Sequence, residues 1–588
     1  MRRTDLDARA VGREPATPPP APRETVGARW VVWALLGILL LALVTDLLFY
    51  TGYYASDDRQ YLRGAWQLAE SGRLNLITTG TVRLMLVAPL ALVARLTDRN
   101  LFLMTASLAL YHLLVVIGTY WVGRLIHGVS TGLLAAGFIA VCPLAVVFAT
   151  MMVPDHEVTA LSLLAAGCLL VARRRLTEDA KGVRSAGALC ALGGFLFGLA
   201  CGAKITAVIL TPVFALLLLS RARAASLRRV LRAGLWFVLG AAVAVALLWA
   251  LFYAATGLSS PLQDPRMASR VSTVPERVAA KPYDSFGGRL ERLAGFAAKR
   301  GRLSLPVLAA LLAILGYPLL RGRSWGLYLT LIWVCVYMTW GTFSLSRYLP
   351  PPMQIRYFLL ALPVLMIMLA YPVVVATRWL WRRFEGSLLG RRTLVAAGVS
   401  CLLAVTACYL MLNQLAGKSY YAAEVAGARH ALDFATGSGE RPVIMSWWLS
   451  DRMWPLLQTK RWSGVVTSPR GTTRADMRNY LASGFLYLDC EREQVEDRWA
   501  ATRSPLDLAI QEALAGRDEA LQVRTIGSFG QFETRFAALR QKLNGSQIPA
   551  AAGRKGRRVF VREVVGSPGR PATTVAPEQE RAARAPNL

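Results

Sequence analysis

Long apolar segments recur along most of this chain and are separated by short polar stretches. The first, Trp30 to Tyr50, is long enough to cross a bilayer core as a helix and lacks a cleavage site, so we interpret it as an uncleaved anchor. Val82 to Leu96 would reach only roughly 22 Å as a helix at about 1.5 Å per residue, which predicts an interfacial helix. Ala186 to Leu219 is too long for one crossing, so a break near Gly202-Ala203-Lys204 predicts a hairpin with Lys204 at its tip.

The remaining apolar segments complete a predicted set of about eleven crossings. They are Leu101 to Leu125, Gly128 to Met152, Val158 to Ala172, Ala233 to Ala255, Leu303 to Leu320, Trp325 to Trp340, Tyr357 to Ala376 and Leu394 to Leu412. The expected fold class is therefore an α-helical polytopic membrane protein. Its transmembrane domain would span residues 30–412, with outer loops at 51–100 and 256–300.

Charge supports this interpretation and predicts an orientation. The 588 residues are 54% hydrophobic and carry a formal net charge of +31, but the arginines cluster between apolar segments, which is the positive-inside pattern and not a nucleic-acid-binding surface. Six arginines precede Trp30, so we expect a cytoplasmic N-terminus and place Asp57 on the outer face. The loop at 256–300 holds more cations than this rule allows. Either the predicted orientation is wrong at this loop, or those cations face an anionic ligand.

The two ends of the chain have a different character. Residues 1–29, which include Pro18-Pro19-Pro20, predict a disordered cytoplasmic tail, and 566–588 predict a second disordered segment. Residues 413–565 are mostly polar with short apolar runs. The runs 443–446, 485–488 and 558–561 are typical of buried strands, and 422–435 has a helical pattern. We expect an extracytoplasmic α/β domain.

Ionisable residues gather at the outer ends of several crossings. They are Asp57, Asp58, Asp155, His156, Glu157, Lys204, Arg347 and Arg356. Such residues at a membrane border are costly and are candidates for function. A carboxylate can accept a proton from an acceptor hydroxyl, and cations can stabilise the charge that develops on a leaving phosphate. This combination indicates a site for a lipid phosphate.

Each of these residues also has a purely structural explanation. Asp57 and Asp58 could cap the helix that begins near Arg59, and Asp155 could interact with the dipole of the helix that it starts. Lys204 could extend along apolar surface to reach the interface, and Arg356 with Tyr357 could anchor a helix there. Sequence alone leaves these alternatives open.

Four motifs, in this order and on one predicted side, resemble the GT-C glycosyltransferases. They are the acidic pair Asp57-Asp58, Met151-Met152-Val153-Pro154-Asp155, the run from Gly198 to Thr206 and the run from Gln354 to Pro363. The closest likeness is to the branch holding protein O-mannosyltransferases and the aminoarabinose transferase that modifies lipid A. It covers about residues 30–380. Members take a sugar from a polyprenyl-phosphate carrier on the outer face of the membrane and invert its anomeric centre.

The resemblance implies a role for each matching residue. Asp57 would be the general base toward the acceptor, Asp58 its neighbour, and Asp155 the second-loop acid. Lys204 and Arg356 of the later motifs would contact the donor phosphate, with Tyr357 beside them. Arg347, on the same predicted face, is a further candidate for a phosphate contact.

The triplet Asp155-His156-Glu157 is also similar to the acid-x-acid motif of oligosaccharyltransferases, which hold a divalent metal there. No metal is required by the first likeness, but one bound by Asp57, Asp155 and Glu157 is left open. Ser446-Trp447-Trp448 is similar to part of the oligosaccharyltransferase acceptor motif, but Leu449 stands where that motif has Asp.

The function expected is transfer of one monosaccharide from a polyprenyl phosphate to a hydroxyl on a protein, lipid or envelope glycan, at a bacterial inner membrane. Oligosaccharyltransferase-like transfer is the alternative within the enzyme class. A transporter or flippase for lipid-linked sugars is the alternative from another class. A transporter would need charged residues along a path inside the crossings. Most ionisable residues here lie at the ends of the crossings instead, and Asp46 is an exception.

Overall fold

The structure is a computed structural model of the chain. It describes residues 28–48, 50–53, 57–76, 80–176, 180–219, 226–265, 267–269, 287–291, 332–334, 336–337, 355–383, 443–445, 466–467, 485–491, 522–530 and 558–565. Several predicted features lie outside these residues: Leu303 to Leu320, Leu394 to Leu412, residues 1–27 of the first predicted tail, the second predicted tail and Arg347.

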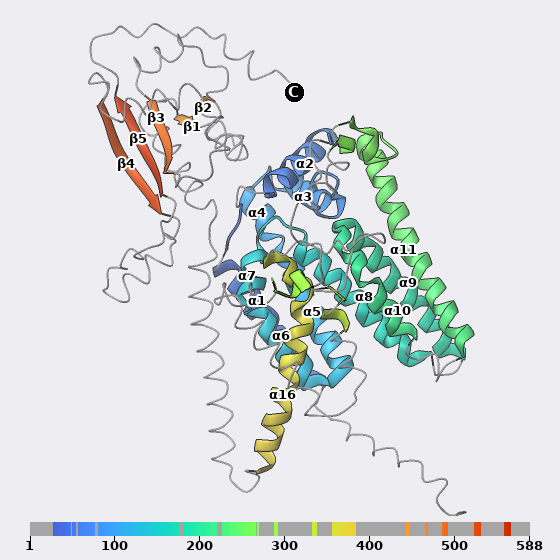
Figure 1. The fold of residues 1–588 in the computed structure, drawn as a ribbon. Helices are drawn as coiled ribbons and strands as arrows, with labels where there is room; N and C mark the ends of the chain where they lie inside the picture. Colours follow the sequence, from blue (N-terminus) through green and yellow to red (C-terminus); the bar gives the residue numbers. More distant parts are fainter. Residues whose placement is uncertain are drawn as a thin grey trace, which may run out of the picture.

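Long apolar helices dominate the N-terminal two thirds of the chain (Figure 1). Within the described part, six helical stretches are long and apolar enough to cross a membrane: Arg29–Leu48, Leu101–His127, Asp155–Arg175, Gly182–Ala203, Leu227–Gln263 and Leu362–Trp379. They contain α1 (Ala28–Leu48), α4 (Leu101–Ala106) with α5 (Ala109–His127), α8 (Asp155–Arg175), α9 (Ala180–Ala203), α11 (Leu227–Thr256) with the 3₁₀ turn η2 (Pro261–Gln263), and α16 (Leu362–Arg383). The helical membrane architecture is confirmed, and the count of eleven crossings stays a prediction.

Shorter helices connect these long ones. They are α2 (Asp58–Ser71), α3 (Leu84–Leu96), α6 (Val129–Ala140), α7 (Pro143–Ala149), η1 (Ile205–Leu210), α10 (Thr211–Leu219) and η4 (Ile355–Leu360). The segment expected as one crossing over 128–152 is divided into α6 and α7, and whether it crosses the membrane stays a prediction. The break falls at Cys142, whose backbone is extended, and Pro143 begins α7 because proline has no N–H to continue the helix before it.

The predicted break in the hairpin falls where the sequence places it. Helix α9 ends at Ala203, Lys204 has an extended backbone with φ −157° and ψ 119°, and η1 begins at Ile205. The chain therefore changes direction at a charged residue, and Lys204 is held between two apolar helices.

Helices α9 and α11 pack against each other more closely than side chains would permit, because glycines line their contact. A Cβ placed on Gly194 would lie 1.8 Å from the carbonyl oxygen of Phe237, and one on Gly240 would lie 1.9 Å from that of Ala191. Small residues that bring helix backbones together are characteristic of packing within membranes, where apolar burial drives association only weakly.

Helix α8 occupies the middle of the helical bundle (Figure 1). It contacts α5 and α9 along its length, and α7, α10 and η4 at further points. Almost every residue from Asp155 to Ala172 is buried. The first turn of α8 is consequently fixed by several neighbouring elements.

The C-terminal part of the described chain forms one mixed sheet. Its strands are β1 (Val443–Met445), β2 (Val466–Thr467), β3 (Phe485–Glu491), β4 (Gln522–Gly530) and β5 (Arg558–Val565), in the order β2-β1-β3-β5-β4 (Figure 1). Strand β1 runs parallel to β2 and β3, while β5 is antiparallel to β3 and β4. The three predicted strands are confirmed. The predicted helix at 422–435 lies outside the described residues, so the α/β class of this domain stays a prediction.

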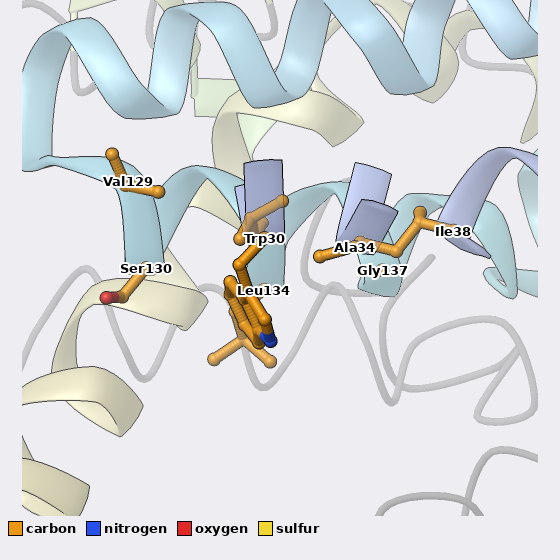
Figure 2. Close-up of a pocket in the computed structure, with 8 residues that line it drawn as sticks. Trp30, Ala34, Ile38, Val129, Ser130, Leu134 and Gly137 are labelled. Carbon is orange, nitrogen blue, oxygen red and sulfur yellow. The ribbon is translucent and has the colours of Figure 1, made fainter. Parts of the chain in front are cut away.

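An apolar groove of about 410 Å³ lies between α1 and α6 (Figure 2). Its lining residues are Trp30, Ala34, Ile38, Val129, Ser130, Leu133, Leu134 and Gly137. Outside this lining, the guanidinium of Arg378 donates a hydrogen bond of 3.3 Å to the Ser130 hydroxyl. The lining itself contains no charged side chain.

Candidate active site

The candidate residues come from four separate elements. Asp57 immediately precedes α2, Asp155 is in the first turn of α8, Lys204 links α9 to η1, and Arg356 with Tyr357 lies in η4. The contacts described below join all four elements into one cluster.

Asp57 is not a helix cap in the usual sense. It occupies the N-cap position of α2, but its backbone is helical and its side chain makes no capping hydrogen bond. Its Oδ2 instead lies 2.8 Å from Nη1 of Arg356, and the Asp57 side chain remains 43% exposed. The carboxylate is thus held by a cation on one side while staying accessible on the other.

Asp155 and Lys204 form a second ion pair, and this one is buried. Lys204 Nζ lies 2.5 Å from Asp155 Oδ1, with side-chain exposures of 6% and 5%. Within the described structure Asp155 Oδ2 has no hydrogen-bond partner. Burial lowers the pKa of Lys204, and the adjoining carboxylate opposes that shift. Lys204 therefore does not extend freely to the interface, because a specific acid fixes its ammonium group.

Tyr357 lies between the two ion pairs. Lys204 Nζ is 3.6 Å from the centroid of the Tyr357 ring, and Arg356 Cζ is 5.8 Å from it. Both cations face the electron-rich ring, which attracts them. Burial raises the pKa of the Tyr357 phenol, so the hydroxyl keeps its proton and can donate a hydrogen bond.

Arg83 is a neighbouring cation that the sequence analysis missed. It occupies the N-cap position of α3, its guanidinium donates a hydrogen bond to the Tyr61 hydroxyl, and Cζ lies 5.4 Å from the Tyr61 ring centroid. Its charge acts on both Lys204 and Tyr357. Burial raises the pKa of Tyr61 to about 12. Arg83 precedes an apolar segment on the predicted outer face, where the positive-inside rule disfavours a cation. That position is the sequence signal that could have identified it.

Two other predicted residues are placed differently. Asp58 is buried in the first turn of α2, where its Oδ1 accepts a hydrogen bond of 3.1 Å from the backbone N–H of Arg59. That position also suits the helix dipole. Arg347 lies outside the described residues, so its predicted phosphate contact stays a prediction.

The described structure does not bring the three residues proposed for a metal together into one ligand group. Among the described residues no group of three or more His, Cys, Asp or Glu side chains could hold a metal ion. Asp57 and Asp155 each pair with a cationic side chain, while both carboxylate oxygens of the buried Glu157 have no hydrogen-bond partner within the described structure, so a metal at these residues stays a prediction. No catalytic step is therefore assigned to a metal held by Asp57, Asp155 and Glu157.

A buried polar chain fixes the helix that carries Asp155. His112 Nδ1 on α5 lies 2.8 Å from Asp46 Oδ2 on α1, and both side chains are fully buried. The His112 ring stacks on that of His156 at 5.1 Å, and His156 Nε2 donates a hydrogen bond of 2.7 Å to the Ala145 carbonyl of α7. These contacts tie three helices to the first turn of α8. From the sequence, Asp46 was identified only as an ionisable residue inside a crossing.

Comparison with known proteins identifies the fold. No protein-family model matches the sequence, and no curated protein matches it. The chain is similar to ArnT from Cupriavidus metallidurans, solved in the apo state and bound to undecaprenyl phosphate, at 13% identity and a TM-score of 0.50. The match covers 91% of this chain and 98% of ArnT. This chain has the GT-C fold. The predicted resemblance to GT-C proteins is confirmed at the level of fold.

A second set of GT-C neighbours comes from Archaeoglobus fulgidus. They are structures of the oligosaccharyltransferase AglB, one of them in complex with an inhibitory peptide and a dolichol-phosphate. That match has 14% identity, a TM-score of 0.44 and covers 72% of this chain. This chain spans 63% of the length of that AglB chain. AglB and ArnT are both polyprenyl-phosphate-dependent glycosyltransferases with the GT-C fold.

Proposed function

We propose that this protein is an inverting glycosyltransferase that moves one monosaccharide from a polyprenyl-phosphate carrier to a hydroxyl acceptor. The observation that carries the proposal is the cluster around Tyr357, in which an exposed carboxylate, Asp57, and a buried one, Asp155, each pair with a cation. This cluster supplies both a base and a phosphate-binding surface. The fold that it shares with ArnT supports the same class of donor.

Asp57 is the base in this proposal. Its exposed oxygen accepts the proton of the acceptor hydroxyl while that hydroxyl oxygen bonds to C1 of the sugar. The bond from C1 to the phosphate oxygen breaks on the opposite face, its electron pair goes to the phosphate, and free polyprenyl phosphate leaves. Because attack and departure occur on opposite faces, the anomeric configuration inverts. Arg356 holds the Asp57 carboxylate in place until the donor arrives.

Lys204 and Arg356 bind the leaving phosphate. The phosphate gains negative charge as the C1–O bond breaks, and fixed cations in a site with little water stabilise that charge strongly. Asp155 and the Tyr357 ring position the Lys204 ammonium, so it needs no reorganisation during the reaction. Asp155 is thereby a positioning residue, while Lys204 and Arg356 contact the donor. Arg347 is proposed as a further contact from sequence.

Topology and partners follow the sequence analysis. The protein would be a multi-pass protein of a bacterial inner membrane with a cytoplasmic N-terminus, and the site and the 413–565 domain would face outward. The acceptor would be a protein, a lipid or an envelope glycan. Leu449 stands where the oligosaccharyltransferase acceptor motif has Asp, which favours the branch of protein O-mannosyltransferases and aminoarabinose transferases over oligosaccharyltransferase-like transfer.

Mass analysis of lipid-linked sugars and envelope glycans tests this proposal in cells. Cells lacking the protein are complemented with the wild-type chain, with Asp57→Asn or with the control Glu70→Gln. Glu70 is a suitable control because its ion pair with Arg99 is exposed and should contribute little. We expect Asp57→Asn to accumulate the sugar-charged polyprenyl phosphate and to lose one monosaccharide from an acceptor, while the control behaves as wild type. An acceptor glycan unaltered by Asp57→Asn would remove Asp57 from the base role. Glycans equally altered by both variants would show that the loss is not specific to Asp57, and would contradict the proposal.

A further inference from the structure

A cavity of about 580 Å³ lies where the end of α8 and the starts of α9 and α11 meet. Its lining residues are Leu176, Val183, Arg184, Gly187, Ala188, Ala191, Arg229, Arg232, Ala233 and Trp236. None of them belongs to the cluster around Tyr357. The cavity therefore needs an explanation separate from the proposed transfer reaction.

Three arginines line this cavity. Arg184 comes from α9, while Arg229 and Arg232 are three residues apart on α11 and so lie on one face of that helix. The side chains are exposed, and the cavity lining contains no acidic residue. Guanidinium groups are planar forks of N–H donors that match the oxygens of a phosphate.

The rest of the lining is apolar and contains several small residues. Gly187, Ala188, Ala191 and Ala233 leave a shallow floor between α9 and α11. Trp236 packs over Gly187 so closely that a Cβ on that glycine would lie 3.1 Å from the indole Cδ1. Tryptophan beside arginine at the end of apolar helices is typical of the boundary between lipid tails and head groups. The cavity thus offers a place for an acyl chain directly beside a place for a phosphate.

We propose that this cavity binds an anionic glycerophospholipid, with the phosphate on Arg184, Arg229 and Arg232 and one acyl chain along the small-residue floor. Basic pockets between membrane helices suit such head groups. Charge complementarity selects this occupant: a zwitterionic lipid would bring its own cation to three arginines, and a free phosphate would leave the apolar floor empty. The groove between α1 and α6 differs from this cavity, because its lining has no charged side chain that could select a lipid head group.

Native mass spectrometry of the full-length, delipidated protein in detergent tests the proposal. The probes are phosphatidylglycerol and phosphatidylcholine with identical acyl chains, and inorganic phosphate as competitor. We expect tighter binding of phosphatidylglycerol, weakened roughly fivefold by each of Arg184→Gln, Arg229→Gln and Arg232→Gln. Arg228→Gln is the matched control, because Arg228 neighbours Arg229 on the same helix but does not line the cavity. These arginines are exposed, so the variants should fold.

A second variant distinguishes binding of lipid inside the cavity from general attraction of anionic lipid to basic helices. Ala188→Trp fills the cavity and keeps every arginine, so it should abolish the bound phosphatidylglycerol. Equal binding of the two lipids, equal losses in Arg228→Gln and Arg229→Gln, or full binding in Ala188→Trp would overturn the proposal. Displacement by millimolar inorganic phosphate would also overturn it, since it would assign the arginines to a free anion. None of these outcomes depends on sugar transfer.

Discussion

Arg356 holds Asp57 through an ion pair in which Nη1 lies 2.8 Å from Oδ2. The two residues belong to η4 and to the start of α2, which are far apart in the sequence. The same guanidinium is 5.8 Å from the centroid of the Tyr357 ring, which Lys204 Nζ also approaches, at 3.6 Å. One arginine therefore links the proposed base to the proposed phosphate site, and donor binding and base positioning should depend on it together.

Arg356→Ala is expected to lower kcat/KM for transfer by roughly a hundredfold, because it removes a cation from the developing phosphate charge. Arg356→Lys should recover only part of the loss, since an ammonium group lacks the bidentate geometry of the guanidinium. Steady-state kinetics with varied donor measure this. Arg378→Ala is the control, because Arg378 contacts Ser130 at the α1/α6 groove. Equal losses in the Arg356 and Arg378 variants would contradict the role of Arg356.

Lys204→Met should destabilise the protein strongly. It leaves the Asp155 carboxylate buried without its cation, which costs about 3–5 kcal/mol of unfolding free energy in comparable buried pairs. The double variant Lys204→Met/Asp155→Leu should recover much of that stability and still fail to transfer sugar. Thermal unfolding in detergent and a transfer assay on the same samples measure both quantities. A double variant that is stable and active would exclude Lys204 from donor binding.

Donor binding should weaken at a lower alkaline pH than an ordinary lysine would allow. Burial lowers the pKa of Lys204, so the ammonium loses its proton as the pH rises through that lowered value, and the phosphate loses a cation. Lys204→Arg keeps its charge and should move the alkaline limb of donor KM to higher pH. Measuring donor KM against pH for both proteins tests this. Identical alkaline limbs would assign the titration to another group.

Gly240→Ala should destabilise the α9–α11 pair by about 1–3 kcal/mol, as overpacking of a close contact does. The added methyl would lie 1.9 Å from the Ala191 carbonyl oxygen, so the helices would have to separate. Gly234→Ala on the same helix is the control, because nothing lies within 4 Å of a Cβ there. It should be neutral or stabilise α11 by up to about 1 kcal/mol, given the helix propensity of alanine. A lower melting temperature in both variants would contradict this packing.

Local pattern predicted much of the helical framework. The long apolar runs predicted α1, α8, α9 and α11, and the surplus length around Gly202 predicted the break at Lys204. The division into α6 and α7 was missed because hydropathy stays high through Cys142 and only Pro143 marks the end of a helix. Strands β2 and β4 were missed because their pairing to distant strands, more than their own composition, defines them.

The sequence predicted which residues belong to the candidate cluster around Tyr357, but not how they pair. Sequence order and charge singled out Asp57, Asp155, Lys204 and Arg356, yet nothing local specifies that Asp57 pairs with Arg356 and Asp155 with Lys204. Arg83 was missed because one arginine beside an apolar segment resembles an interfacial anchor. The His112–Asp46 pair was missed because it forms between two crossings, where only three-dimensional packing brings the groups together.

Phosphorus NMR of the purified protein in nanodiscs tests the central claim most directly. A sugar-charged polyprenyl phosphate is a phosphodiester, and the free carrier is a phosphomonoester, so transfer converts one signal into the other. With donors isolated from the native membrane and an envelope acceptor fraction, the wild-type protein should produce the monoester signal and Asp57→Asn should not. A phosphodiester signal that persists with the wild-type protein, or conversion by Asp57→Asn at the wild-type rate, would contradict the account.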